Sequence, residues 1–219
     1  MTDKFRNFKE LKKVRPKSFA IEMYSREGDF LLFAPHAGGI EPGTSEICKW
    51  FNKDHYSYYV FEGKGKYCRE LHITSTRFNE PEFINLLSTK RHAISFHGMT
   101  DYYSRKNNSD IFLGGLNCEL IKFTKINLKA SGFRVSTNIE LPTSSLSGKE
   151  PQNVTNRCTG KMGMQVEISE KLRRKFFQGE LKRKDGRSKT TDSFEVFCNS
   201  INESIFNYKQ RLITSTTRK

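Results

Sequence analysis

The stretch from Phe30 to Glu46 constrains the fold more than any other part of the sequence. It begins with an apolar run of strand length that we expect to stop just before His36. Two glycines then make a flexible loop that brings the Glu41 carboxylate back toward this histidine, and Thr44 or Ser45 can cap a following helix. A strand, a loop with one His and one Glu, and then a helix indicate a metal site at the carboxyl edge of an α/β sheet.

The composition is that of a single domain with an aromatic core. Of the 219 residues 35% are hydrophobic, a low fraction, but the 18 Phe and 8 Tyr each bury a large area. No run is long enough to span a membrane, and the basic segment 1–17 has no apolar signal-peptide core. We therefore expect synthesis in the cytoplasm without a signal peptide, and no membrane partner. The five scattered cysteines include no Cys-x-x-Cys pair, which favours reduced thiols.

The net charge of +14 predicts an anionic partner. Nucleic acid, an anionic membrane and an acidic polymer all carry suitable charge, and the charge alone does not choose among them. Nucleic acid ranks low because the sequence has no helix-turn-helix signal, zinc-finger spacing or RNP pattern. Most Phe and Tyr residues also fall at the periodicity of a core rather than on a polar face.

Alternating strands and helices predict one α/β domain with an open mixed β-sheet flanked by helices. We expect a basic N-terminal arm at 1–17, a core at 20–177, a basic loop at 178–192 and a C-terminal helix at 193–212. The irregular segment 136–161 is long enough to suggest a functional loop or lid. Besides Phe30–Pro35, the expected strands are 18–24, 58–61, 71–74, 91–96, 111–115 and 164–169, and the other expected helices are 45–53, 82–89 and 117–129.

Metal-competent side chains stand at three of these strand ends. They are His36 with Glu41, then His97, then Glu167. Two imidazoles and one carboxylate form a common catalytic zinc set, and a further carboxylate, here Glu167, can act as the general base. Each residue also has an ordinary interpretation, because a histidine after a strand is often only hydrogen-bonded and an alternating strand also has outward positions, one of which Glu167 can occupy.

Six motifs follow one another along the chain. They are His36-Ala-Gly-Gly-Ile-Glu41-Pro-Gly-Thr-Ser-Glu, Leu71-His72-Ile-Thr-Ser75-x-Arg-Phe-x-Glu-Pro81, Ser95-Phe-His97-Gly98, Phe112-Leu-Gly-Gly115, Asn153-x-x-Asn156-Arg157 and Gly163-Met-Gln-Val-Glu167-Ile-Ser169. In this order they resemble the poly-γ-glutamate hydrolase family, a group found in phages and bacilli and related to zinc carboxypeptidases. The match runs from about residue 20 to 177.

The resemblance implies a zinc carboxypeptidase-like fold, with zinc on His36, Glu41 and His97 and with Glu167 as general base. It also implies hydrolysis of the γ-amide links between glutamates. Related exopeptidases carry their first His and Glu two residues apart, whereas four residues intervene here, so the ligand role of Glu41 depends on the nearer family. Glu46 is the rival carboxylate, although its place in the first turn of a helix accounts for it.

Three further residues are candidates for substrate binding. Arg157 with Asn156 resembles the Asn-Arg pair with which carboxypeptidases hold a substrate carboxylate, and a guanidinium fork suits that group. His72 would orient substrate or steady the site. The alternative interpretation of Arg157 is an ordinary surface arginine of a basic protein, and that of His72 is an ordinary hydrogen-bonded histidine in a strand.

The leading hypothesis is a monomeric zinc hydrolase that depolymerises poly-γ-glutamate, an anionic polymer that the positive charge would attract. If the chain is phage-encoded, we expect its release by host lysis. The alternative is a zinc amidase or peptidase for another acidic substrate, such as a peptidoglycan γ-glutamyl link or an N-acyl amino acid. A nucleic-acid-binding protein is the third hypothesis.

Overall fold

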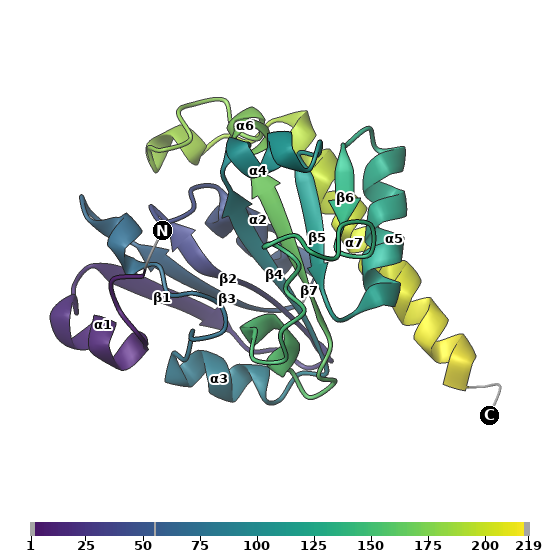
Figure 1. The fold of residues 1–219 in the computed structure, drawn as a ribbon, viewed down its shortest axis with the longest axis horizontal. Coiled ribbons are helices and arrows are strands. Elements are labelled where there is room, and N and C mark those ends of the chain that lie inside the picture. The colour runs from purple at the N-terminus through teal and green to yellow at the C-terminus, as the bar shows by residue number, and fades with distance from the viewer. Residues whose placement is uncertain (1–2, 55, 217–219) are drawn as a thin grey trace.

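The computed structural model describes residues 3–54 and 56–216, in which a seven-stranded mixed sheet is covered by helices on both faces (Figure 1). The strand order is β1-β3-β2-β4-β7-β5-β6. Strands β3, β2, β4 and β7 are parallel, while β1 and β5 run antiparallel to β3 and β7. The strands are β1 (Phe19–Tyr24), β2 (Phe30–Gly38), β3 (Ser57–Gly63), β4 (His92–Met99), β5 (Ile111–Gly115), β6 (Val135–Thr137) and β7 (Gly163–Ser169). Because β2, β4 and β7 are parallel neighbours, their carboxyl ends meet at one edge.

Seven α-helices surround this sheet in the described residues. They are α1 (Phe8–Val14), α2 (Thr44–Trp50), α3 (Pro81–Leu87), α4 (Asp101–Lys106), α5 (Cys118–Ala130), α6 (Glu170–Lys175) and α7 (Asp192–Thr216). Short 3-10 helices are η1 (Phe51–Asp54), η2 (Cys68–Leu71), η3 (Val154–Arg157) and η4 (Asp185–Arg187). None of the helices in the described part of the chain has both the length and the apolar character needed to cross a membrane.

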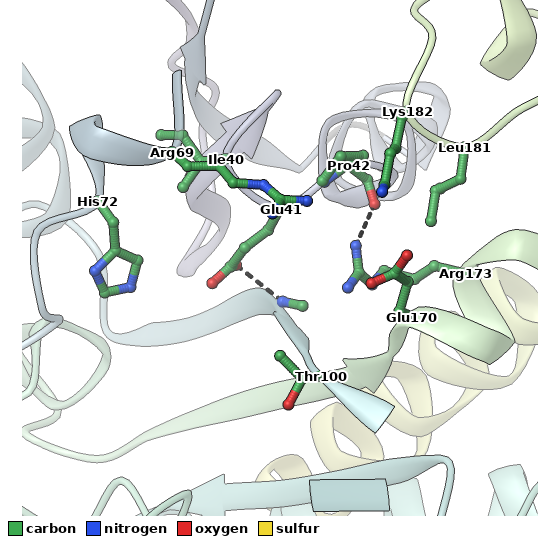
Figure 2. A pocket seen from close by; sticks show the side chains of 11 residues that line it. Ile40, Glu41, Pro42, Arg69, His72, Thr100, Glu170, Arg173, Leu181 and Lys182 are labelled. Carbon is green, nitrogen blue, oxygen red and sulfur yellow. Dashed lines mark hydrogen bonds between the residues drawn. The ribbon is translucent and has the colours of Figure 1, made fainter. Parts of the chain in front are cut away.

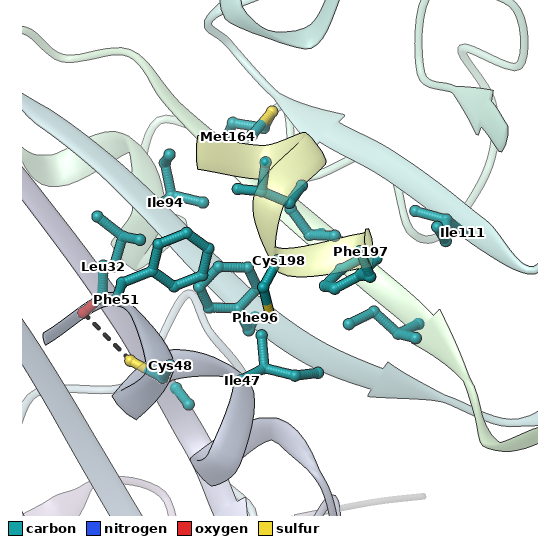
Figure 3. Packing of buried hydrophobic residues seen from close by; sticks show 14 of the residues in the cluster. Leu32, Ile47, Cys48, Phe51, Ile94, Phe96, Ile111, Met164, Phe197 and Cys198 are labelled. Carbon is teal, nitrogen blue, oxygen red and sulfur yellow. Dashed lines mark hydrogen bonds between the residues drawn. The ribbon is translucent and has the colours of Figure 1, made fainter. Parts of the chain in front are cut away.

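Alternate residues of the buried strands build two cores, one on each face of the sheet. On one face, Leu32 and Phe96 pack with α2, α5 and α7 (Figure 3). On the other face, Leu31 and Phe33 pack with α1, α3 and the segment after η2. The face of α7 predicted from its spacing is buried, with Phe194, Phe197, Cys198, Ile201, Ile205 and Tyr208. The prediction of an open mixed sheet flanked by helices is confirmed.

Helix α2 is fastened to α7 through the single tryptophan of the sequence. The indole Nε1 of Trp50 donates a 2.8 Å hydrogen bond to Glu195 Oε2. The ammonium of Lys53 lies 3.4 Å from the centroid of the indole ring. This contact holds the helix that directly follows the Glu41 loop.

Several local expectations were wrong. The segment 71–74 is not a strand, because Leu71 ends η2 and the following residues are irregular, although Leu71 and Ile73 are buried. Strand β2 does not stop before His36 but continues to Gly38 through an irregularity between Ala34 and Ala37. Helix α4 and strand β6 were not predicted. The basic arm contains α1; its first two residues lie outside the described part.

Candidate metal centre and active site

Neighbouring strands β2 and β4 bring His36 and His97 together. Both rings are buried, and their Nδ1 atoms are 3.2 Å apart. The shifted register of β2 at Pro35 lets the strand continue past the proline, which has no N–H to donate. The loop then turns back, with the Glu41 N–H donating to the His36 carbonyl at 2.8 Å.

Glu41 completes a set of three donor atoms that fits a zinc ion. Its Oε1 is 3.4 Å from His36 Nδ1, and its Oε2 is 3.7 Å from His97 Nδ1. Zinc bonds of about 2.0–2.2 Å at tetrahedral angles place ligand atoms about 3.3–3.6 Å apart. These donors, all within 4.8 Å of one another, are the one such cluster found among the described residues.

Neighbouring groups orient the three donors. The Nε2 of His36 lies 2.7 Å from the Ile73 carbonyl, which can only accept, so Nε2 carries the proton and Nδ1 presents its lone pair. The N–H of Gly98 donates to Glu41 Oε2 at 2.9 Å. Burial alone would raise the pKa of Glu41, but the adjacent His36 and His97 outweigh it and hold that pKa well below its usual value. The carboxylate is therefore charged and ready to bind a cation.

Glu167 lies beside this cluster on β7, directly across from His97 on β4. It is buried rather than outward-facing. Burial raises the pKa of Glu167 to about 7, an effect that the charge of His97 opposes and that of Glu41 reinforces. Gln165 Nε2 lies 3.4 Å from Glu167 Oε1 and can donate to it. A buried carboxyl group with a pKa near neutrality can exchange protons at physiological pH.

His72 is adjacent to the cluster but is not one of its three donors. Its ring centroid is 4.0 Å from that of His36, and its Nδ1 lies 2.7 Å from Asp3 Oδ1. The charge of His36, followed by burial, lowers the pKa of His72, although Asp3 and Glu41 oppose this effect. A neutral His72 at the edge of the site can still donate or accept a hydrogen bond.

The structure does not bring Asn156 and Arg157 into the same site. Arg157 is exposed and donates to the Phe78 carbonyl at 3.2 Å. The Asn156 side chain is fully occupied by backbone groups: its Oδ1 accepts from the N–H groups of Leu116 and Gly163, and its Nδ2 donates to the carbonyls of Gly148 and Glu150. Their substrate-binding role stays a prediction, and these positions weigh against it.

Two cavities meet at the metal centre and share Glu41, His72, Gly98 and Thr100. The first, of about 430 Å³, contains the two ligand histidines and Glu167, so we call it the reaction cavity. The second, of about 290 Å³, lies on the other side of Glu41, and we call it the side cavity (Figure 2). Its lining residues are Ile40, Glu41, Pro42, Arg69, His72, Gly98, Thr100, Glu170, Arg173, Leu181 and Lys182.

One wall of the reaction cavity is residues 144–150, which we call the amide-held wall. Gln165 Nε2 donates to the Leu146 carbonyl at 2.9 Å, and Asn138 Nδ2 donates to the Ser147 carbonyl at 2.9 Å. Asn156 adds the contacts to Gly148 and Glu150 described above. The wall is close-packed as well, since a Cβ on Gly148 would lie 2.5 Å from the Gln165 side chain. The segment predicted as a lid is thus fastened here by buried amides.

Residues 177–190, which we call the basic strap, contribute Leu181 and Lys182 to the lining of the side cavity. The ends of the strap are joined by a bridge between Phe177 and Thr190, and Arg187 fastens it to α2 through a 2.7 Å ion pair with Glu46. Arg187 Nη1 also donates to the Leu181 and Arg183 carbonyls at 2.7 and 3.1 Å. Glu46, the rival ligand, is therefore engaged by an arginine and is not one of the three clustered donors.

Sequence reasoning missed four residues that shape the site: Gln165, Arg69, Lys182 and Arg173. Arg173 is buried and donates to carbonyls at the ends of three segments, those of Pro42, Met99 and Ile168. A Cβ on Gly98 would lie 2.5 Å from its guanidinium carbon, so this glycine makes room for it. The signals for Gln165 were its place in the motif Gly163-Met-Gln-Val-Glu167-Ile-Ser169 and its position two residues before Glu167, which puts both on one face of β7.

Comparisons with known proteins show the family of this chain. The family model for poly-gamma-glutamate hydrolase matches residues 5–200. The SPbeta prophage-derived protein YoqZ of Bacillus subtilis (strain 168) is 40% identical over 177 residues, which cover 80% of this chain and 62% of that relative. The chain therefore spans less than two thirds of the length of this relative.

Two solved structures are similar over almost their whole length. A bacteriophage poly-gamma-glutamate hydrolase is 33% identical with a TM-score of 0.87, covering 95% of this chain and 99% of that one. A zinc-free apo form of YndL is 28% identical with a TM-score of 0.85, covering 94% and 99%. With the family model matching most of the sequence, this chain belongs to the poly-gamma-glutamate hydrolase family and has its zinc carboxypeptidase-like fold.

Proposed function

We propose that this chain is a zinc-dependent hydrolase that cleaves the γ-glutamyl amide bonds of poly-γ-glutamate. The observation that carries the proposal is the convergence of His36 Nδ1, His97 Nδ1 and the Glu41 carboxylate beside the buried Glu167. Their spacing and donor chemistry suit zinc. When bound, zinc lowers the pKa of water and polarises a carbonyl group.

The residues of the chain divide the remaining work. The Ile73 carbonyl and the Gly98 N–H keep the His36 and Glu41 donors aimed at one point. Glu167, with a pKa of about 7, accepts a proton from the attacking water at neutral pH. It can then return the proton to the leaving amine nitrogen, since a base that has taken up a proton is a competent acid. His72, at the rim shared by both cavities, is placed to hydrogen-bond substrate.

The polymer would approach as a polyanion. Poly-γ-glutamate carries one carboxylate per residue, and a chain of net charge +14 attracts it over a distance that salt shortens. The name of the similar bacteriophage hydrolase supports the same substrate.

The metal is tested by measuring zinc content and thermal unfolding of wild type and His97→Ala. We expect one zinc per wild-type chain, a higher unfolding temperature with zinc than after chelation, and neither effect in the variant. Asn85→Ala on the exposed face of α3 is the control and should behave like wild type. Zinc binding that survives in His97→Ala would contradict the ligand set.

The reaction is tested on γ-linked and α-linked oligoglutamates, a peptidoglycan γ-glutamyl peptide and an N-acyl amino acid. We expect zinc-dependent release of new amino groups from the γ-linked oligomers above all others. Glu167→Gln keeps the size of the side chain but removes the base, so kcat should fall about 10²- to 10⁴-fold with zinc still bound. Preferred cleavage of one of the other substrates would favour the alternative amidase.

A further inference from the structure

We propose that the side cavity is a carboxylate subsite, in which Arg69 and Lys182 hold the α-carboxylate of one glutamyl residue next to the scissile bond. This inference rests on the proposed function and names residues that bind its substrate. The side cavity touches the reaction cavity at Glu41 and Gly98, so a substrate with its scissile amide at the metal centre extends naturally into it.

Two cations from different parts of the fold line this cavity. Arg69 belongs to η2, and Lys182 belongs to the basic strap. Figure 2 shows the end of the Arg69 side chain next to Glu41 and the end of the Lys182 side chain next to Pro42, with Pro42 between the two cations. Both residues are exposed. Within the described residues, neither side chain makes a hydrogen bond or a close ion pair, so both remain available to a ligand.

Arg173 lines the same cavity, but it is buried and three of the five N–H groups of its guanidinium already donate, to the carbonyls of Pro42, Met99 and Ile168. Its main contacts are therefore within the protein. The exposed cations of the cavity are Arg69, whose planar fork can make two parallel hydrogen bonds with the carboxylate, and Lys182 as a point charge.

The acids of the cavity leave this positive charge in place. Glu170 forms an ion pair with Arg174, one helical turn away. Burial opposes the fall of the Glu170 pKa, which comes from Arg174 first and to a smaller extent from Lys182. Glu41 faces His36 and His97 and would share its charge with the metal. Arg69 and Lys182 are thus the groups left to meet an incoming carboxylate.

The remaining lining suits the hydrocarbon part of a γ-glutamyl residue. Ile40 and Leu181 are buried and line the cavity, and Figure 2 shows Pro42 between them. In a γ-linked chain, two methylene groups separate the scissile carbonyl from the carbon that bears the carboxylate. Apolar side chains next to two cations suit the hydrocarbon and the carboxylate of such a residue. Arg187 and Glu46 keep Leu181 and Lys182 in place by fastening the strap.

The test measures binding of γ-linked tetraglutamate to the zinc-loaded Glu167→Gln protein, which should bind without turnover. Adding Arg69→Ala or Lys182→Ala should each raise Kd about tenfold or more, because a charge-assisted hydrogen bond is lost. Arg69→Lys should recover part of the loss. A tetramer with its α-carboxylates converted to carboxamides should bind weakly and be insensitive to either substitution.

Two matched controls separate the subsite from general attraction. Lys64→Ala and Lys184→Ala remove the same charge from exposed positions outside the cavity and should change Kd by less than about twofold. If Arg69→Ala and Lys182→Ala behave like these controls while wild type still hydrolyses the polymer, the subsite is wrong and the function stands. If zinc-loaded wild type neither binds nor cleaves γ-linked oligomers, the proposed function fails and the subsite fails with it.

Discussion

The amide-held wall and the basic strap enclose the same centre from two sides, but different chemistry fastens them. The amide-held wall is tied down by neutral side chains, those of Asn138, Asn156 and Gln165, which donate to its carbonyls. The basic strap is tied down by Arg187, which pairs with a carboxylate and donates to two carbonyls. One side is held without charge, and the other depends on it.

This difference matches what each side faces. The amide-held wall borders the reaction cavity that contains Glu167, and the neutral amides that hold this wall add no charge of their own beside that residue, whose pKa burial raises. The basic strap borders the side cavity, for which we propose an anionic ligand. The charge of the buried Arg187 inside the strap is compensated by Glu46, so it is Lys182 that presents a positive charge to the side cavity.

The largest expected effect is that of Arg187→Met, which removes the charged fastening of the basic strap and leaves Glu46 and two backbone carbonyls without their donor. Loss of one partner from a buried ion pair should lower the free energy of unfolding by about 3–5 kcal/mol, measured by urea unfolding. The KM for oligoglutamate should also rise, although Arg187 does not line the side cavity.

The control is Arg183→Ala, whose partner Asp185 is exposed and which should give no measurable change. The double variant Arg187→Met with Glu46→Leu should regain part of the lost stability, because no uncompensated charge remains. Full stability of Arg187→Met would show that the strap is held by its apolar contacts alone.

The neutral side is tested by Asn156→Ala, which removes four hydrogen bonds and deprives the Gly163 N–H and the Gly148 carbonyl of this partner. The Leu116 N–H still donates to the Gly163 carbonyl, and the Glu150 carbonyl still accepts from the Asn153 N–H. We expect a loss of about 2–4 kcal/mol in the free energy of unfolding, since each buried unpaired group costs about 1–3 kcal/mol and the wall can relax toward solvent. Asn85→Ala, on an exposed helix face, should stay within about 0.5 kcal/mol of wild type. A rise in KM without loss of stability would instead assign Asn156 to substrate binding.

The smallest expected effect is that of pH on activity. The groups that fasten the two sides do not titrate near neutral pH, since amides have no ionisable proton and arginines stay protonated, so the pH dependence comes from Glu167. Between the two sides, Glu167 must lose its proton to act as a base, and burial raises its pKa to about 7. The value of kcat/KM should therefore fall about tenfold per unit as pH drops below that pKa. Bound zinc lowers the pKa of a nearby carboxylic acid, so the fall begins at or below about pH 7. An activity that begins to fall only below pH 4 would contradict the assignment of Glu167.

The sequence was most informative where spacing alone controls position. His36, His97 and Glu167 stand near the carboxyl ends of parallel strands, so predicting those strands was enough to bring the residues to one edge. Most strands and the long helices were also recognisable from periodicity. The segment 71–74 looked like a strand because it is partly β-branched, but Ile73 is buried against the second core without joining the sheet.

Residues whose role depends on distant partners could not be recognised in the same way. Nothing in the basic stretch 171–189 distinguishes the buried Arg173 and Arg187 from their exposed neighbours, because their partners Pro42 and Glu46 are more than a hundred residues away. Asn156 and Arg157 show the reverse case. Because they are adjacent, we expected the two side chains to bind a substrate carboxylate. In the fold, the Asn156 side chain bonds to backbone groups, and the exposed Arg157 side chain donates to the Phe78 carbonyl.

The lone tryptophan gives the molecule a built-in optical probe. Trp50 sits at the end of the helix that follows the Glu41 loop, and its indole touches both Glu195 and Lys53. Its emission therefore reports, without an added label, the contact between α7 and α2, the helix that follows the Glu41 loop. Fluorescence titrations with metal or oligomer can follow that contact in real time, because excitation at long wavelength selects tryptophan over tyrosine.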